Sequence, residues 1–191
     1  GTAYGNIWIS ESEDLIHWGN HKLVMKNFYL GDNYWEKVKI GAGPIPIKTK
    51  DGWILIYHGV QSTCNGLNYS VGVALLDLND PSKVLKRAGR YLLTAEKDYE
   101  KTGFTPNVCF PCSALCNSKG QVTIYYGVAD TNMAIAFTTT NFSNLWINIT
   151  AERISKVKMS YSRLIAAFWR VQTQSPVANN FCYFSGAFSL T

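Results

Sequence analysis

Apolar residues gather in short stretches along the chain, and turn residues separate these stretches. Residues 53–57, WILIY, are all apolar, which is typical of a short strand that is buried on both faces. Two further apolar stretches, residues 6–10 and 15–18, flank an acidic turn. We therefore expect a chain of antiparallel strands that opens with a hairpin, whose second strand is residues 15–18.

One of these units is repeated. Residues 52–60, GWILIYHGV, match residues 120–128, GQVTIYYGV, at an offset of 68 residues. Each copy follows a turn that ends in glycine, at Gly52 and Gly120, because glycine tolerates the positive φ of a tight hairpin. Apolar stretches flank each copy, so each unit reads strand, turn, strand, loop, strand. Such units are typical of β-propeller blades, and a β-sandwich is the alternative.

The end of the sequence follows another pattern. Apolar residues recur at helical spacing between Ile154 and Phe168. We expect an all-β unit over residues 1–140, a partial propeller of about three blades, and a divergent tail over residues 141–191. The tail is either a packed terminal helix or an extension of other structure, and we assign it no chemistry.

Composition and charge limit the function. Hydrophobic residues make up 47% of the 191 residues, aromatic residues 14% and charged residues 16%, as in a globular protein rich in sheet. The net charge of +5 is concentrated in residues 151–191, whose balance is +4, so residues 1–150 carry only +1. We therefore expect no nucleic-acid partner. No stretch approaches the ~18 apolar residues of a membrane-spanning helix, so we expect no membrane partner and a cytoplasmic location.

The cysteines and the acidic residues near the start invite other interpretations. Cys109, Cys112 and Cys116 have the spacing of half a zinc site, but no fourth cysteine or histidine lies near them in sequence. We expect buried thiols and no metal, with Cys109 on one face of a strand and the other two cysteines on the opposite face. Glu11, Glu13 and Asp14 are expected in a solvated turn and not as a general acid and base.

Two basic side chains lie in apolar surroundings. His58 ends the first repeat, where the strand gives way to a loop, and Lys39 lies in the apolar stretch VKIGAGPIP. A lysine in such a strand must reach water or meet an anion. Gly41 and Gly43 would let backbone N–H groups approach a small anion such as phosphate. The alternatives are a hydrogen-bonded histidine at a sheet edge and glycines that only bend the strand.

Asp130 ends the second repeat, as His58 ends the first. A carboxylate there can accept hydrogen bonds from sugar hydroxyl groups, and Tyr69, Tyr125 and Tyr126 offer faces on which a sugar can stack. The alternative for Asp130 is a cap on a turn.

Five segments together resemble glycoside hydrolase family 130, which contains mannoside phosphorylases and mannosidases. They occur in the family order and cover roughly residues 6–140; they are residues 9–24, 39–60, 69–87, 99–111 and 124–130. The resemblance implies a five-bladed β-propeller with a sugar site in its central channel. It also implies that Lys39 and His58 hold inorganic phosphate, and that Tyr69, Asp130 and Phe110 lie near the bound sugar.

The reaction that the resemblance implies is inverting phosphorolysis of a β-mannoside to mannose 1-phosphate. The expected partners are a mannose-containing oligosaccharide and phosphate as co-substrate, with no cofactor and no metal. The catalytic Asp of the family belongs to a Glu-Asp-Pro-Arg-like motif upstream of the segment that matches residues 7–10, and this sequence has no such motif. We therefore expect a truncated chain without its catalytic Asp. An inactive glycan-binding remnant, a non-catalytic all-β fragment and a β-mannoside hydrolase are the alternatives.

Overall fold

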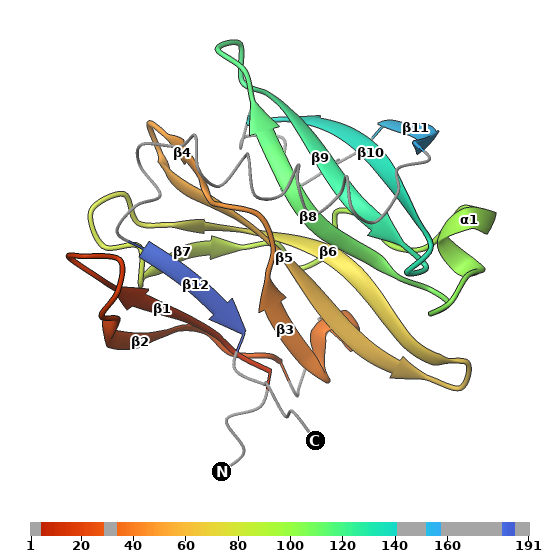
Figure 1. Cartoon of the computed structure of the whole chain (residues 1–191), viewed down its shortest axis with the longest axis horizontal. Coiled ribbons are helices and arrows are strands. Elements are labelled where there is room, and N and C mark those ends of the chain that lie inside the picture. The colour runs from red at the N-terminus through yellow and green to blue at the C-terminus, as the bar shows by residue number, and fades with distance from the viewer. Residues whose placement is uncertain (1–4, 29–33, 141–151, 158–180, 186–191) are drawn as a thin grey trace.

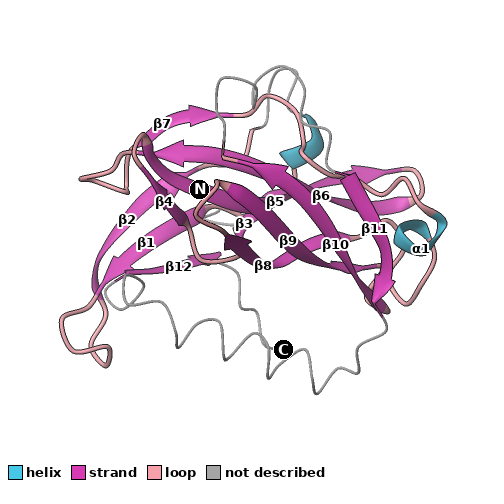
Figure 2. Cartoon of the chain, turned by 90° about the horizontal axis from the view of Figure 1, so that it is seen from above, coloured by secondary structure: helices cyan, strands magenta, loops and turns pink. Residues whose placement is uncertain are grey.

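The computed structural model describes residues 5–28, 34–140, 152–157 and 181–185. Strands in three sheets make up most of this part of the chain (Figure 1), and its two helices are single short turns (Figure 2). The all-β fold class is therefore confirmed, while the arrangement of the sheets as propeller blades stays a prediction. Neither helix in the described residues is long and apolar enough to span a membrane.

Sheet A contains the predicted N-terminal hairpin. Its strand order is β12-β1-β2, with β12 at Phe181–Ser185, β1 at Ile7–Glu11 and β2 at Gly19–Met25. The prediction of a strand at residues 15–18 is wrong. Oδ1 of Asp14 accepts hydrogen bonds from the backbone N–H groups of Ile16 at 2.8 Å and His17 at 2.7 Å, and these bonds hold a turn. Asp14 and Glu13 are exposed in that turn, as predicted.

Sheet B contains the first repeat. Its order is β3-β5-β6-β7, and a further strand, β4, also pairs with β5; the strands are β3 (Lys39–Ala42), β4 (Ile47–Thr49), β5 (Gly52–Thr63), β6 (Gly66–Leu76) and β7 (Val84–Arg87). All of its pairs are antiparallel. Gly52 has a φ of 140°, so the turn between β4 and β5 uses the freedom expected of glycine.

Sheet C contains the second repeat. Its order is β11-β10-β9-β8, with β8 at Cys109–Cys116, β9 at Gln121–Val128, β10 at Asn132–Thr139 and β11 at Glu152–Val157. The predicted helical spacing from Ile154 to Phe168 is wrong at its start, because residues 152–157 form a strand that pairs with β10. Residues 158–168 lie outside the described part of the chain.

A β-bulge in β8 changes the faces of its cysteines. The register shifts between Pro111 and Ser113, so Cys109 pairs with Val128 and Cys116 with Val122. Val122 and Val128 lie on one face of β9, and the prediction that Cys109 and Cys116 lie on opposite faces is therefore wrong. Cys109 is buried as expected, but Cys116 is exposed. Among the described residues, no group of three potential metal ligands lies close together.

Two apolar cores hold the sheets together. One lies between sheets A and B and includes Ile7, Ile9, Leu55, Tyr57 and Leu76. The other lies between sheets B and C and includes Ile54, Ile56, Val71, Ile124 and Tyr126. Side chains on successive residues of β5 thus point into different cores, which explains why residues 53–57 are apolar without interruption.

The two repeats correspond in space with an offset of 69 residues, one more than the sequence match suggests. Leu55 and Tyr57 face the core that sheet B shares with the preceding sheet, A. Ile124 and Tyr126 face the core that sheet C shares with its preceding sheet, B. The equivalent of Tyr57 is therefore Tyr126 and not Tyr125, because the face of the sheet decides which residues correspond.

A buried glutamate on a short helix binds each of these tyrosines. The hydroxyl of Tyr57 donates to Oε2 of Glu36 at 2.9 Å, and the hydroxyl of Tyr126 donates to Oε1 of Glu100 at 2.8 Å. Both glutamates have 0% exposure. Glu36 belongs to the 3-10 helix η1 (Tyr34–Glu36), and Glu100 to the helix α1 (Asp98–Lys101). The repeat therefore includes an aromatic-Glu-Lys triplet, residues 35–37 and 99–101, which the sequence analysis missed.

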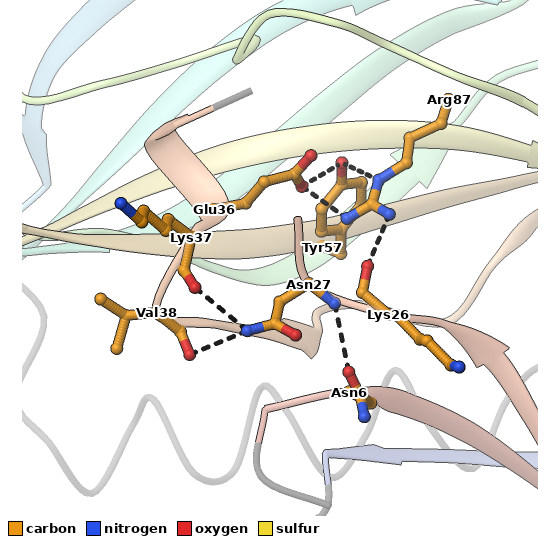
Figure 3. A network of polar contacts seen from close by, with 8 residues as sticks. All are labelled: Asn6, Lys26, Asn27, Glu36, Lys37, Val38, Tyr57 and Arg87. Atoms are coloured by element: carbon orange, nitrogen blue, oxygen red, sulfur yellow. Dashed lines mark hydrogen bonds and ion pairs between the residues drawn. The ribbon is translucent and has the colours of Figure 1, made fainter. Parts of the chain in front are cut away.

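Arg87 ties the first of these glutamates to the end of β2 (Figure 3). Its Nη2 forms an ion pair with Oε2 of Glu36 at 2.7 Å, and its Nη1 donates to the backbone oxygen of Lys26 at 2.7 Å. The neighbouring Asn27 donates from Nδ2 to the backbone oxygens of Lys37 and Val38, both at 3.1 Å (Figure 3). This network fixes the segment that leads into β3, and so fixes the backbone at Lys39.

Candidate functional site

Strand pairing brings Lys39, His58 and Tyr69 to the same face of sheet B. In the β3–β5 pair, Lys39 lies opposite Val60, and His58 lies opposite Gly41. In the β5–β6 pair, Tyr69 also lies opposite Val60. Opposite residues of paired strands share a face, and so do residues two apart, so the three side chains are neighbours on one face.

Ring contacts complete a compact group, which we call the cation–aromatic cluster: Lys39, His58, Tyr69 and Phe110. Nζ of Lys39 lies over the ring of Tyr69, 5.3 Å from its centroid. The ring of His58 lies 5.8 Å from that of Tyr69 and 4.7 Å from that of Phe110, measured between centroids. Since Phe110 belongs to β8, the cluster joins sheets B and C at the end of their shared core.

His58 is buried within this cluster with an unused polar atom. Its side chain is 6% exposed, and Nδ1 has no hydrogen-bond partner among the described residues. Burial, and secondarily the charge of Lys39, lowers the pKa of His58 from 6.5 to about 4. The imidazole is therefore neutral at neutral pH. A buried polar atom without a partner costs free energy, and a bound ligand can supply the missing partner.

We expect the buried neutral imidazole of His58 to make the stability depend on pH. Because folding lowers its pKa, the folded state is favoured above pH 6.5 and loses this contribution as the pH falls from 6.5 towards about 4. The loss should reach about 3 kcal/mol at most. Urea unfolding of the chain across this range should show the decline, and His58→Gln should make it smaller. His17→Gln, at an exposed histidine, is the control. An equal decline in both variants would contradict this assignment.

The glycines after Lys39 have structural roles. The backbone N–H of Gly43 donates to the backbone oxygen of Ile56 at 3.1 Å, so the prediction that this group is available to an anion is wrong. A Cβ at Gly43 would lie 2.9 Å from Cγ of Pro111, so this glycine allows sheets B and C to approach each other. Gly41 pairs with His58, and the absence of a side chain there leaves room on the face that carries the cluster.

Asp130 lies beside this cluster, on the turn between β9 and β10. The turn has left-handed backbone at Ala129 and Asp130, both with a φ of 48°. Asp130 is exposed, and its charge contributes to the raised pKa of the Cys112 thiol, after burial as the main cause. Figure 1 shows the end of β9, the start of β8 and the β5–β6 hairpin at the same end of the sheets. The five residues predicted for the site therefore gather at one end of the molecule, four of them in mutual contact.

One proposed stacking residue is excluded. Tyr126 is fully buried and bonded to Glu100, so its ring is not available to a sugar. Tyr125 is half-buried on the other face of β9. The aromatic faces that remain at the site are those of Tyr69 and Phe110, the latter 37% exposed. An ammonium group, a neutral imidazole and two aromatic rings can together bind an anion next to a sugar.

Comparison with known proteins agrees with this geometry. Residues 2–146 match a family model described as β-1,4-mannooligosaccharide phosphorylase. The chain belongs to glycoside hydrolase family 130. All five predicted site residues fall within the part of the chain that matches family 130.

Named relatives in family 130 are mannoside phosphorylases. The chain is 47% identical over 139 residues to the β-1,4-mannooligosaccharide phosphorylase of Ruminococcus albus, which covers 72% of this chain and 40% of that protein. It is 41% identical over 129 residues to the β-1,2-mannobiose phosphorylase of Listeria innocua, which covers 68% of this chain and 34% of that protein. The chain thus spans less than half the length of these relatives.

Solved structures in family 130 have the same fold over the shared part. The β-1,2-mannobiose phosphorylase from Listeria innocua, in complex with β-1,2-mannobiose, matches 70% of this chain and 36% of its own with a TM-score of 0.62 and 40% identity. A glycoside hydrolase from Parabacteroides distasonis matches 73% of this chain and 44% of its own with a TM-score of 0.59 and 27% identity.

Proposed function

We propose that this chain carries the phosphate-binding and mannose-binding part of an inverting β-mannoside phosphorylase, built as a five-bladed β-propeller around the sugar site. One observation carries the proposal: Lys39 and His58 lie together on one face, and the buried Nδ1 of His58 has no partner among the described residues. An anion with hydrogen-bonding oxygens satisfies both groups at once. The phosphorylase relatives support phosphate as that anion.

The two residues would contribute in different ways. Lys39 supplies the positive charge. His58, with a pKa of about 4, supplies a hydrogen bond and no charge at neutral pH. Phosphate bound between them would be oriented for attack, because charge and direction come from separate groups on rigid strands.

The sugar would lie against the aromatic rings of the cluster. Tyr69 and Phe110 would pack on its C–H groups, and Asp130 would accept hydrogen bonds from its hydroxyl groups. A phosphate oxygen then attacks the anomeric carbon from the face opposite the leaving oxygen. The bond from carbon to that oxygen breaks, the electron pair stays on the oxygen, and a carboxylic acid gives it a proton. We propose that this acid lies outside the 191 residues, since they contain no Glu-Asp-Pro-Arg-like motif.

A substrate whose leaving group needs no proton tests the proposal on the chain as it is. Dinitrophenyl β-mannoside releases a stable phenolate, so a site that holds phosphate and mannose can act on it without the acid. We expect dinitrophenolate release that depends on phosphate concentration, with mannose 1-phosphate as the product detected by phosphorus NMR.

Other outcomes would favour the alternatives. Release at the same rate without phosphate, with free mannose as the product, would indicate a β-mannoside hydrolase. Binding of β-mannobiose without any release would indicate a glycan-binding remnant. Neither release nor binding would leave a non-catalytic all-β fragment as the conclusion.

A further inference from the structure

An exposed aromatic residue lies next to Asp130. Phe104 is 89% exposed, the most exposed large hydrophobic side chain of the described residues. It belongs to a loop that joins α1 to β8, and we call residues 102–108 of this loop the strap. An isolated exposed Phe is common on protein surfaces, so its meaning depends on how the strap holds it.

Hydrogen bonds fix the strap to the turn that carries Asp130. The backbone N–H of Phe104 donates to Oγ1 of Thr131 at 2.9 Å, and that of Thr105 donates to the backbone oxygen of Ala129 at 3.2 Å. A Cβ at Gly103 would lie 2.4 Å from that same oxygen, so the strap backbone lies directly on the turn. The exposure of Phe104 is therefore not the result of a loosely held loop.

The other end of the strap is fixed to the cation–aromatic cluster. The backbone N–H of Tyr69 donates to the backbone oxygen of Asn107 at 2.9 Å. The N–H of Ala129 donates to the oxygen of Val108 at 3.1 Å, which closes the strap against the turn. The strap thus runs from Asp130 to Tyr69, the two ends of the candidate sugar site.

We propose that Phe104 is a second sugar-binding residue, which stacks on the mannose unit next to the one that Asp130 holds. A carboxylate beside an aromatic face is the pair of groups that recognises a sugar ring, through its hydroxyl and C–H groups respectively. A single ring held at a fixed backbone suits one further sugar unit, while a protein partner needs a larger apolar patch. This inference rests on the proposed function and specifies its substrate as an oligosaccharide.

Calorimetric titration of the chain with mannose, β-mannobiose and β-mannotriose, each with phosphate present, tests this role. Affinity should rise by about threefold to tenfold on adding the sugar unit that contacts Phe104. Phe104→Ala should remove that rise and leave the affinity for mannose unchanged, and Phe104→Trp should restore the rise. Ile16→Ala, at a residue 76% exposed on the β1–β2 turn, is the matched control and should change nothing.

The outcomes separate this inference from the proposed function. If the wild-type chain binds phosphate and mannose but Phe104→Ala keeps the full rise, the role of Phe104 is refuted and the proposed function stands. If the wild-type chain binds neither phosphate nor any of the three mannosides, both are refuted. Loss of mannose binding in Phe104→Ala together with the rise would also refute the second subsite, because it would place Phe104 at the first sugar.

Discussion

Replacement of Lys39 by alanine should weaken the binding of inorganic phosphate to this chain by about 10- to 100-fold. Charge-assisted hydrogen bonds contribute about 1.5–3 kcal/mol, which corresponds to that range in affinity. The remaining partner, His58, is neutral at neutral pH and cannot replace the charge. Phosphorus NMR titration of the wild-type and variant chains measures the difference directly.

The same substitution should also raise the pKa of His58. The charge of Lys39 is the second cause of the low pKa, after burial, so its removal should shift the pKa only part of the way from about 4 towards 6.5. Proton NMR of the imidazole follows this shift independently of phosphate. Lys37→Ala is the matched control, because Lys37 is an exposed lysine two residues away on the same segment. Equal phosphate affinity in Lys39→Ala and wild type would remove the basis of the proposed site.

The sequence was sufficient to predict the site residues that strand pairing brings together. His58 and Lys39 stand out in sequence because charged or polar groups in apolar strands need a partner. Their positions at the ends of strands in a repeated unit then predict that they face a common site. The ring contacts of Phe110 with His58 needed the structure, because they join two sheets and no local pattern encodes that distance.

Features that depend on a choice of face were harder to predict. The match of the repeats gave 68 residues, but burial of Tyr57 and Tyr126 in successive cores requires 69. A bulge at Cys112 likewise reversed the expected faces of the cysteines. A shift of one residue moves a side chain to the other face of a sheet, so small errors in register change every inference about contacts.

The acidic and apolar residues of the first hairpin show a competing local effect. The apolar letters of residues 15–18 suggested a strand, yet Ile16 is 76% exposed and Leu15 has a φ of 61°. The carboxylate of Asp14 binds two backbone N–H groups that a strand would need, so side-chain hydrogen bonding outweighs hydrophobic pattern over so short a stretch.

Replacement of Glu36 by leucine should lower the free energy of unfolding by about 3–5 kcal/mol, the largest effect on stability that we expect from a single residue. Glu36 is fully buried, and its Oε2 accepts hydrogen bonds from both Tyr57 and Arg87. Burial raises the pKa of Glu36 even though Arg87 lowers it, so desolvation of the pair is incompletely offset. The variant leaves the guanidinium of Arg87, in a side chain 12% exposed, without its counter-charge.

A double replacement separates the lost pair from the lost packing. Because much of the cost comes from the buried charge that remains, Glu36→Leu combined with Arg87→Met should be less destabilising than the sum of the two single variants. Urea unfolding followed by tryptophan fluorescence gives all three values. Glu11→Leu breaks the surface pair between Glu11 and Lys22, whose side chains are 35% and 50% exposed, and should cost no more than about 1 kcal/mol. Additive effects in the double variant, or a cost for Glu36→Leu no larger than that for Glu11→Leu, would show that the ion pair does not hold the segment before Lys39 in place.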